Sequence, residues 1–364
     1  MKKIVLLINY LVNGGPSQIV YNLAKSINKK EYVVSLITIF NKNNSTIIEE
    51  LRANSINVLE LNFEKRNYFS WFFLARKVRK IIENENPDIV HSHGFFPDMI
   101  NQHLNIYNIS TLHCNIYEDY KLRYGKLMGE IFIHIHLKSL NKIDKIICCS
   151  KSIYEVMNKK INNSCYIRNG SSSRKCKDEQ ITRSDLNIPN NALVYIYVGT
   201  ITKRKNVLYL VENFVKYHNL DEYLIILGEG PEMEDCKKLA DENIIFLGFR
   251  NDVNSYYKIS NVYISASLSE GFSMSIIEAL DNKLFLFLSN IPSHREVFEI
   301  DTNFYLGECF SYDNFIDKLE ILRNSIKHND KNELINFKNL YLSSECMTNQ
   351  YQNVYDGGSN NGKG

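Results

Sequence analysis

The stretch Val262-Tyr-Ile-Ser-Ala-Ser-Leu-Ser-Glu270-Gly-Phe-Ser-Met-Ser-Ile-Ile-Glu278-Ala-Leu280 joins a short apolar run to an apolar helical pattern through small and polar residues. Residues 262–266 predict a strand and residues 275–280 predict a helix. Glu270 would then lie at the carboxyl end of a strand, where open α/β sheets bind ligands. The loop would place three backbone N–H groups near a helix N-terminus, an arrangement that favours phosphate or another anion. These belong to Gly271, Phe272 and Ser273.

Glu278 follows about two helical turns after Glu270, so its side chain can project back toward the same loop. One carboxylate in the loop and one on the helix suit the hydroxyls of two sugars joined by a diphosphate. The alternative is a capped surface helix that carries two solvated glutamates. That alternative stays open on spacing alone, because a pair of Glu at this spacing is a weak signal in a chain with 41 acidic residues.

The bulk properties point to an ordinary globular protein with more than one domain. A chain of 364 residues is longer than one hydrophobic core usually needs, which favours two domains. No apolar run reaches the roughly 18 residues of a membrane-spanning helix. The N-terminal run Ile4–Ile8 breaks at Asn9 without a cleavage site, so it predicts a buried strand and not a signal peptide. The eight cysteines form no Cys-x-x-Cys pair, which predicts reduced and mostly buried thiols.

Charge is unevenly distributed along the chain. Residues 1–180 hold 26 Lys and Arg against 16 Asp and Glu, whereas residues 181–364 hold 17 against 25. A basic first half and an acidic second half suggest different partners for the two halves.

Short apolar runs alternate with helical patterns in both halves, which is typical of βαβ units in a parallel sheet. In the first half the predicted strands are 4–8, 32–40, 58–61, 89–91, 109–113 and 145–149, and the predicted helices are 17–27, 46–53, 70–84 and one after Pro97. After Pro189 the predicted strands are 193–198, 223–227, 244–247, 262–266 and 284–288, and the helices are 207–218, 231–241, 253–260 and 275–280. The sequence therefore predicts an α/β protein with two doubly wound domains that face each other across a cleft.

Two glycine-containing junctions are candidate phosphate sites. Gly14 and Gly15 follow the first predicted strand, where glycines allow close approach of a phosphate, although a plain tight turn explains them equally well. Lys203, Arg204 and Lys205 precede a predicted helix, a position that the helix macrodipole disfavours for cations. A bound diphosphate would explain these three charges, and a solvated basic turn is the alternative.

Weaker signals follow other predicted strands. Gly228 and the pair Phe249-Arg250 lie in loops where backbone atoms can hold a flat base. His113, His91 and His93 lie at strand ends, where a histidine is more often structural, and His91-x-His93 can also be read as half of a metal site without an obvious third ligand. The chain contains no Asp-x-Asp, so a cation clamp without metal is favoured.

The segment Phe63–Lys80 combines the only Trp with five other aromatic residues and six cations. This composition suits a helix at the surface of an anionic membrane. A core-packed amphipathic helix with a basic outer face explains it as well, and the sequence does not separate the two.

Taken together, these motifs resemble the GT4-type (group 1) family of retaining glycosyltransferases with the GT-B fold, most like bacterial surface-polysaccharide enzymes. The motifs that carry the resemblance run through most of the chain: Gly14-Gly15, 88–94, 111–113, Ser150, 167–170, 198–199, 204–206, 228–231, 247–249, Glu270 with Glu278, and 289–296.

The resemblance implies a domain for each substrate. Residues 1–175 would form an acceptor-binding domain and 185–340 a nucleotide-sugar-binding domain, joined by a polar linker within 171–184. Residues 341–356 would form a helix that crosses back to the first domain, and 357–364 a disordered tail.

The resemblance also implies residue roles. Lys205 and Arg204 would hold the diphosphate, with the backbone of Gly15, while Glu278 would hold the ribose and Glu270 the transferred sugar. The backbone near Phe249-Arg250 would hold the base, and His113 would lie beside the donor sugar. His113, Glu270 and Lys205 are thus the predicted catalytic residues, without metal or cofactor.

Two features depart from the family pattern. Thr200 stands where the family often has an Arg after the phosphate-loop glycine, which leaves the roles of Thr200 and Arg204 open. Residues 282–284 replace the commoner Gly-x-Pro before the last strand, which we expect to alter only a turn.

The resemblance implies transfer of a sugar from a nucleotide-diphosphate sugar, expected to be a UDP-sugar, to a glycan acceptor. The expected acceptor is a lipid-linked intermediate of capsule, O-antigen or exopolysaccharide synthesis, and the expected location is cytoplasmic, peripheral on the inner face of the cell membrane. No nucleic-acid partner is expected. A nucleotide-sugar epimerase or hydrolase of the same fold, and a non-catalytic nucleotide-sugar-binding scaffold, are the alternatives.

Overall fold

The structure, a computed structural model, describes residues 1–12, 14–40, 45–64, 68–172 and 181–358. The chain divides into two compact units. Unit 1 comprises Met1–Ser172 and Ser343–Gly364, and unit 2 comprises Ser173–Leu342. Much of the predicted linker (173–180) and of the predicted disordered tail (359–364) lies outside the described residues.

Unit 1 contains a seven-stranded sheet in the order β3-β2-β1-β4-β5-β6-β7, with every neighbouring pair parallel. Its strands are β1 Lys2–Ile8, β2 Tyr32–Phe40, β3 Asn57–Phe63, β4 Ile89–His93, β5 Tyr107–Leu112, β6 Lys145–Cys148 and β7 Ser164–Tyr166. Its helices are α1 Gly15–Ser26, α2 Ser45–Ala53, α3 Tyr68–Glu85, α4 Phe95–Asn101, α5 Ile116–Tyr124, α6 Lys126–Leu140, α7 Lys151–Met157 and α15 Ser344–Tyr355.

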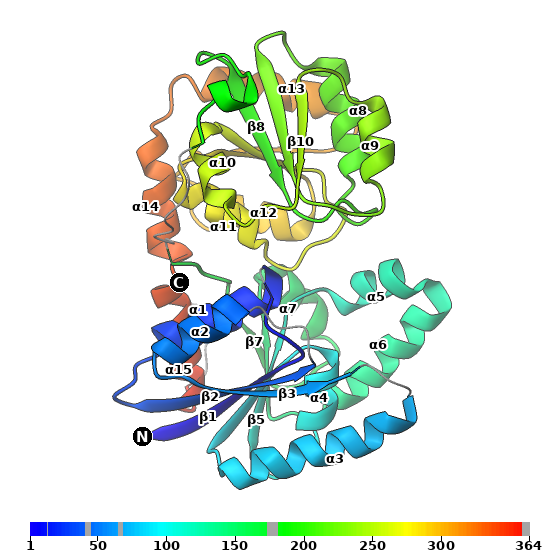
Figure 1. The fold of residues 1–364 in the computed structure, drawn as a ribbon, viewed down its shortest axis with the longest axis vertical. Coiled ribbons are helices and arrows are strands. Elements are labelled where there is room, and N and C mark those ends of the chain that lie inside the picture. Colours follow the sequence, from blue (N-terminus) through cyan, green and yellow to red (C-terminus); the bar gives the residue numbers. More distant parts are fainter. Residues whose placement is uncertain (13, 41–44, 65–67, 173–180, 359–364) are drawn as a thin grey trace. The chain divides into compact units, whose positions relative to one another are not determined.

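Helices cover both faces of this sheet, as the alternation of side chains along a strand requires. On one face Val5, Leu7 and Val90 pack with Val78 and Ile82 of α3 in a common core, and α4 contributes to the same core. On the other face the next residue along β4, His91, contacts Tyr355 of α15. Figure 1 shows α1 and α3 on opposite sides of the sheet.

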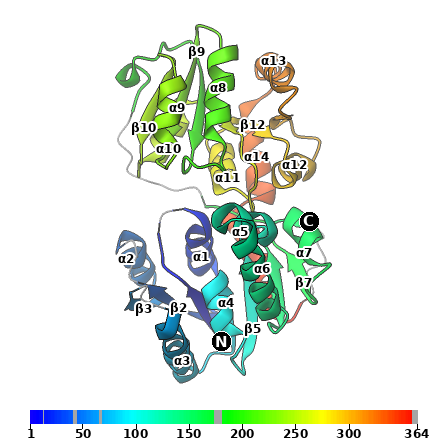
Figure 2. The ribbon, with the colours of Figure 1, turned by 90° about the vertical axis from the view of Figure 1, so that its right-hand side faces the viewer.

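Unit 2 contains a six-stranded sheet in the order β10-β9-β8-β11-β12-β13, again parallel throughout. Its strands are β8 Leu193–Val198, β9 Glu222–Leu227, β10 Ile244–Gly248, β11 Val262–Ser265, β12 Phe285–Ser289 and β13 Gly307–Phe310. Its helices are the 3-10 turn η1 Ser184–Leu186, α8 Val207–Tyr217, α9 Met233–Leu239, α10 Val253–Ile259, α11 Met274–Asp281, α12 Pro292–Glu299, α13 Phe315–Ser325 and α14 Lys331–Tyr341. Figure 2 shows the helices of unit 2 around its sheet from a second direction.

The chain returns from unit 2 to unit 1 at Ser343, which caps α15 by accepting a hydrogen bond from the N–H of Cys346. The cap explains why the helix begins at Ser344 and not at the predicted Tyr341, which instead ends α14. At its far end α15 is fixed to β1, because Lys2 donates to the Tyr355 carbonyl at 3.0 Å and pairs with Asp356 at 2.7 Å.

The helix expected after Pro97 instead begins at Phe95, with Pro97 inside its first turn. Proline is tolerated there because the first N–H groups of a helix have no partner within it.

Candidate active site

Each sheet has a topological switch point, where successive connections leave in opposite directions. In unit 2 it lies between β8 and β11, which are hydrogen-bonded neighbours although 63 residues separate Val198 and Val262 along the sequence. The loops after these two strands carry Arg204, Lys205 and Glu270. The structure therefore brings three of the predicted site residues together at the edge where parallel α/β sheets bind ligands.

Glu270 is the centre of this cluster. Its Oε1 accepts hydrogen bonds from Lys205 Nζ and, at 2.8 Å, from Ser267 Oγ. Its Oε2 accepts from Arg204 Nη1 at 3.1 Å, and the same Nη1 donates to the Ser269 carbonyl at 2.7 Å. Both carboxylate oxygens are thus occupied by cations. The sequence interpretation assigned the cations to a diphosphate and the carboxylate to a sugar, and did not anticipate that they pair with each other.

The cluster is largely shielded from water: the side chain of Glu270 is 8% exposed and that of Lys205 is 15% exposed. Burial alone would raise the pKa of Glu270, but Lys205 and Arg204 outweigh it and lower the pKa to about 2. Glu270 is therefore ionised at neutral pH. Removing one member of a buried pair typically costs about 3–5 kcal/mol, because it leaves a charge without its partner.

Glycines allow the loops around the cluster to approach closely. A Cβ on Gly228 would lie 1.8 Å from the Gly199 carbonyl oxygen, and one on Gly230 would lie 2.0 Å from that of Ile201. Side chains at either position would push the loop after β9 away from the loop after β8. Gly228, predicted as a binding residue, therefore has a packing role in the structure.

Glu278 lies on α11, the helix that follows the Glu270 loop. The Ser275 hydroxyl donates to the Val198 carbonyl at 3.2 Å and holds the start of α11 to the end of β8. Burial together with the charge of Glu278 raises the pKa of Tyr257 well above its usual value. Gly271 and Phe272 are buried in the connecting loop, and no side chain caps α11 at Ser273.

The remaining predicted residues of unit 2 lie at its surface. Thr200 is exposed, and its carbonyl accepts from the Tyr197 hydroxyl at 2.9 Å. Phe249 is 59% exposed and Arg250 is also exposed, directly after β10. An exposed aromatic ring is available to stack on a flat ligand.

His294 on α12 is a residue to which the sequence interpretation gave no role. Its Nδ1 donates to the Ser289 carbonyl at 2.9 Å, which leaves Nε2 as an acceptor. Within the described part of the chain, this buried Nε2 has no hydrogen-bond partner. Burial is the main influence on His294 and lowers its pKa to about 4, and the charges of Glu270 and Lys205 also act on it. The sequence signal that could have identified His294 is its position within 289–296, one of the stretches that carry the family resemblance.

Unit 1 has its switch point between β1 and β4. Gly14 and Gly15, after β1, both have positive φ values, +92° and +52°, that favour glycine over other residues. Gly15 begins α1, and no side chain caps this helix at Gly14. Both glycines are exposed at the start of this helix.

A histidine cluster follows β4 and β5 in unit 1. His93 Nδ1 lies 3.0 Å from His113 Nε2, and the rings of His91 and His93 lie 4.2 Å apart. His91 is fixed by Tyr355 at 2.7 Å and Thr111 at 2.8 Å. Burial lowers the pKa of His113 to about 4 and that of His91 to about 3, so the cluster is neutral at pH 7. For His93 the sequence predicted either a structural role at a strand end or a place in half of a metal site, and the structure shows it as a hydrogen-bond partner of His113.

Two features of the described residues bear on the metal site and the membrane helix that the sequence raised. Among the described residues, no group of three or more His, Cys, Asp or Glu side chains is placed to hold a metal ion. None of the helices in the described ranges is both long and apolar enough to cross a membrane.

Two parallel α/β sheets of seven and six strands, one in each unit, are the architecture of the GT-B class. Two family models cover most of the chain: "Glycosyltransferase Family 4" matches residues 13–170 and "Glycosyl transferases group 1" matches residues 178–335. The chain belongs to this family and is a nucleotide-sugar-dependent glycosyltransferase of the GT4 type.

Individual proteins agree with this assignment. The chain is 27% identical over 303 residues to the UDP-Gal:alpha-D-GlcNAc-diphosphoundecaprenol alpha-1,3-galactosyltransferase of Escherichia coli, covering 75% of this chain and 77% of the relative. It is 24% identical over 290 residues to the O-antigen biosynthesis glycosyltransferase WclY of Escherichia coli, covering 74% and 79%. Among solved structures, Anabaena Alr3699/HepE in complex with UDP and glucose matches with a TM-score of 0.77 at 14% identity, covering 98% of this chain and 100% of HepE, which confirms the predicted GT-B fold.

Proposed function

We propose that the protein is a retaining glycosyltransferase that moves a sugar from a UDP-sugar to a lipid-linked glycan in the synthesis of a bacterial surface polysaccharide. The observation that carries the donor assignment is the cluster of Lys205, Arg204 and Glu270 at the switch point of unit 2. It combines two cations for a diphosphate with a carboxylate for sugar hydroxyls.

UDP is the donor nucleotide proposed here because the galactosyltransferase relative is named for UDP-Gal and HepE was solved with UDP. In this assignment Lys205 and Arg204 hold the diphosphate near the N-terminus of α8, which no side chain caps. Glu278 holds the ribose, Glu270 the transferred sugar, and the backbone at Phe249-Arg250 the base. Thr200, Gly228, Gly271, Phe272 and Ser273 form the surrounding loops.

The chemistry assigned to these groups is electrostatic. In a front-face displacement, the acceptor hydroxyl attacks on the side from which UDP leaves, so negative charge develops on the departing diphosphate. Lys205 and Arg204 stabilise that charge, in a site whose low water content strengthens the interaction. His113, Gly14 and Gly15 are assigned to donor contacts made by unit 1. No metal or cofactor takes part in this scheme.

The acceptor and location follow from the same relatives. Residues 1–175 are proposed to bind the acceptor, and residues 185–340 the donor. A lipid-linked acceptor matches the diphosphoundecaprenol in the name of the galactosyltransferase relative. The enzyme would then work in the cytoplasm at the inner face of the cell membrane.

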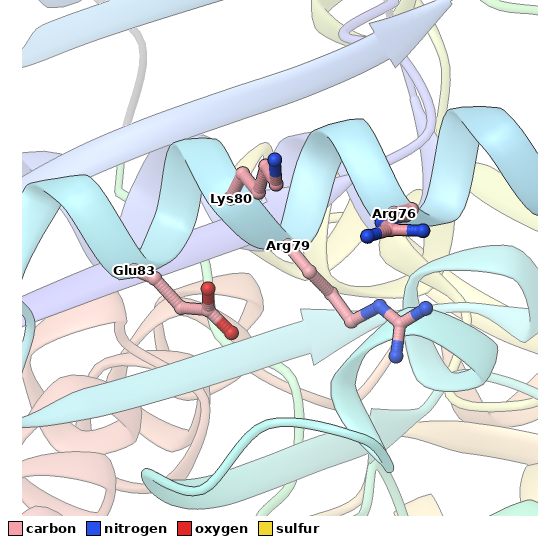
Figure 3. A pocket seen from close by; sticks show the side chains of 4 residues that line it. All are labelled: Arg76, Arg79, Lys80 and Glu83. Atoms are coloured by element: carbon pink, nitrogen blue, oxygen red, sulfur yellow. The ribbon is translucent and has the colours of Figure 1, made fainter.

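The basic segment Phe63–Lys80 is the proposed membrane contact. Residues 65–67 of this segment lie outside the described residues. On α3, Arg76, Arg79 and Lys80 line a shallow pocket together with Glu83 (Figure 3).

The test is a panel of nucleotide sugars screened by thermal shift, followed by product analysis. The true donor at about 100 times its Kd should add about 2.7 kcal/mol to the free energy of unfolding. UDP alone should stabilise the protein and GDP should not. With the stabilising donor and a diphospholipid-linked sugar acceptor, NMR of the product should show the anomeric configuration of the donor retained. The proposal would be rejected if GDP stabilised the protein and UDP did not. A product whose anomeric configuration is inverted relative to the donor would also reject it.

A further inference from the structure

A buried chain of hydrogen bonds connects His294 on α12 with Glu270. The His294 Nδ1–H donates to the Ser289 carbonyl at 2.9 Å, and the Ser289 hydroxyl donates to the Ser267 carbonyl at 2.6 Å. The Ser267 hydroxyl in turn donates to Glu270 Oε1 at 2.8 Å. His294, Ser289 and Ser267 are all buried, so water does not compete for these contacts. The imidazole is therefore part of the structure that holds the carboxylate in place.

The second ring nitrogen of His294 is an acceptor without a donor. Because Nδ1 carries the proton, Nε2 is unprotonated, and no group in the described ranges is hydrogen-bonded to it. A buried acceptor without a partner is unusual in a folded protein and calls for an explanation. Nε2 is a position at which the ring can gain a proton while Nδ1 keeps its contact with Ser289.

The charge of the cluster formed by Glu270, Lys205 and Arg204 acts on His294. Burial lowers the pKa of His294 to about 4, the charge of Glu270 and the Ser289 carbonyl oppose this shift, and the charge of Lys205 adds to it. Two cations and one carboxylate leave the cluster with one excess positive charge, which together with burial keeps the imidazole neutral. A bound diphosphate adds about two negative charges, so the sum becomes negative and favours an imidazolium.

Other ionisable groups near His294 lie outside the two loops that carry this cluster. On β13, Cys309 Sγ lies 3.5 Å from the Ser289 carbonyl, and burial raises the pKa of the thiol to about 12, so it is uncharged at neutral pH. On α12 itself, Arg295 is exposed and donates to Asn290 Oδ1 at 2.8 Å, Glu299 is exposed, and Glu296 is buried. A diphosphate held by the cations of the cluster therefore acts on His294 mainly by reversing the charge of the cluster.

We propose that His294 takes up a proton at Nε2 when a diphosphate binds to Lys205 and Arg204, and that the imidazolium then serves as the counter-charge of Glu270. The proton comes from the solvent and adds to the lone pair of Nε2. When the two cations turn to the diphosphate, Glu270 loses the partners that stabilise a buried carboxylate. The charges of His294 and Glu270 already act on each other, so a protonated ring replaces part of what is lost. His294 is thus a positioning residue, and the inference rests on the proposed donor site.

The direct test is NMR of the full chain with 15N-labelled histidine, titrated between pH 5 and 7.5 with and without UDP. The chain has nine histidines, and the His294 ring is assigned by comparison with His294→Asn. With UDP bound, Nε2 should become protonated at a pH at least about one unit higher than in the free protein. His218, which pairs with Asp241 at 2.8 Å just after the end of α8, should titrate at the same pH in both states. A His294 ring that titrates at the same pH with and without UDP would overturn the proposal.

Calorimetry counts the proton. UDP binding is measured at pH 6 in two buffers whose ionisation enthalpies differ, so the difference in heat gives the number of protons taken up. His294→Asn keeps a donor near the position of Nδ1 but cannot be protonated, and it should take up fewer protons than wild type. Comparison of the two proteins removes the protonation changes of UDP itself. The matched control is His218→Asn, which should take up as many protons as wild type, and an equal number in His294→Asn would contradict the proposal.

The affinity should follow the same linkage. Because binding raises the pKa of His294, the affinity of wild type for UDP relative to His294→Asn should rise as pH falls from 7.5 to 5.5, by up to about tenfold per pH unit. A merely structural role would weaken binding by the same factor at every pH. Thermal unfolding checks that each variant is folded, and His294→Gln replaces His294→Asn if the latter is not. A constant ratio of the two affinities would reject the inference.

Two probes separate this inference from the choice of nucleotide. Inorganic pyrophosphate carries the charge of a diphosphate without the nucleoside, and it should protonate His294 as UDP does. If pyrophosphate protonates His294 and UDP does not bind, the donor assignment fails and the role of His294 stands. If UDP stabilises the protein while His294 stays neutral, the role of His294 fails and the donor assignment stands.

Discussion

Both units have a cluster at the carboxyl edge of the sheet, after β8 and β11 in unit 2 and after β4 and β5 in unit 1, but the two clusters have opposite chemistry. In unit 2, Lys205, Arg204 and Glu270 are ionised and hold each other by ion pairs. In unit 1, His93 and His113 are neutral and hold each other by a hydrogen bond of 3.0 Å. The same parallel-sheet edge therefore supports either a charged or an uncharged site, and the side chains alone decide which. We expect substitutions in the unit 2 cluster to change the charge of the site. Substitutions in the unit 1 cluster should change the orientation of the histidine rings.

The largest effect should come from Lys205→Ala. It removes a charge-assisted contact to the leaving diphosphate and should lower kcat/KM by the equivalent of about 2–4 kcal/mol. Steady-state kinetics with the identified donor measures this loss. Lys203→Ala is the matched control, because Lys203 lies in the same loop but is exposed and should leave kcat/KM near wild type. Equal values for the two variants would remove Lys205 from the site.

The variants Glu278→Gln and Glu270→Gln should distinguish the roles of the two carboxylates in binding the donor. Glu278→Gln should weaken binding of UDP itself, and Glu270→Gln should weaken only the intact UDP-sugar, each by about 1.5–3 kcal/mol for a lost hydrogen bond to a charged group. Calorimetry with both ligands makes the comparison. Identical losses in the two variants would contradict the division of roles.

As pH falls from neutral, the free energy of unfolding should change first through protonation of the buried histidines of unit 1. Because burial lowers the pKa of His113 to about 4 and of His91 to about 3, the unfolded chain binds protons near pH 6.5 before the folded chain does. The stabilisation is complete above pH 6.5 and is lost as pH falls toward 4, by up to about 1.4 kcal/mol per pH unit for each histidine. Glu270, with its pKa lowered to about 2, keeps its contribution above pH 4.5.

Urea unfolding between pH 8 and 4 measures this difference. His113→Phe should flatten the decline between pH 6.5 and 4, and Glu270→Gln should leave the slope in that range unchanged. A slope unaffected by His113→Phe would show that this histidine is not held neutral.

A smaller effect should come from His93→Phe. The ring keeps the volume but loses the hydrogen bond to His113, which is worth about 0.5–1.5 kcal/mol net. We expect kcat to fall about threefold to tenfold without a change in the affinity for UDP, because His113 loses its orientation and the charged cluster is intact. A loss of UDP affinity equal to the loss of kcat would indicate general misfolding.

Chelation should have no effect on activity. Two cations already face Glu270, so the proposed site needs no divalent ion to neutralise a diphosphate. Assays with and without EDTA, before and after added magnesium or manganese, check this. Activity that disappears with EDTA and returns with either metal would reject the cation clamp.

The sequence predicted those helices and strands in which the apolar residues recur with the period of a single type of element, either a helix or a strand. The buried strand β8 and the helices α8 and α11 were found within one or two residues of their bounds, as was the long helix α3. The helices α5 and α6 were not predicted. In α6 the run 133–137 alternates apolar residues with His, and apolar residues occupy both the packed and the exposed face, so no single amphipathic stripe identifies a helix.

The candidate site was predictable in its residues but not in its contacts. Glu270, Lys205 and Arg204 could be identified because strand ends and helix starts have recognisable signals. Their pairing could not be predicted, because it depends on β8 and β11 being neighbours in the sheet. The same limit applies to the His93–His113 contact, which requires β4 and β5 to lie side by side.

The occupied carboxylate of Glu270 makes binding of a diphosphate at this site an exchange of one anion for another. Glu270 neutralises one of the two cations, so the cluster keeps one excess positive charge. Binding should therefore depend less on ionic strength than binding at an open surface with two unpaired cations. A single inorganic phosphate must also displace a carboxylate held by several contacts. Under the proposed function, the site should therefore favour a ligand that also brings hydroxyls to the carboxylate it displaces over a small anion that does not.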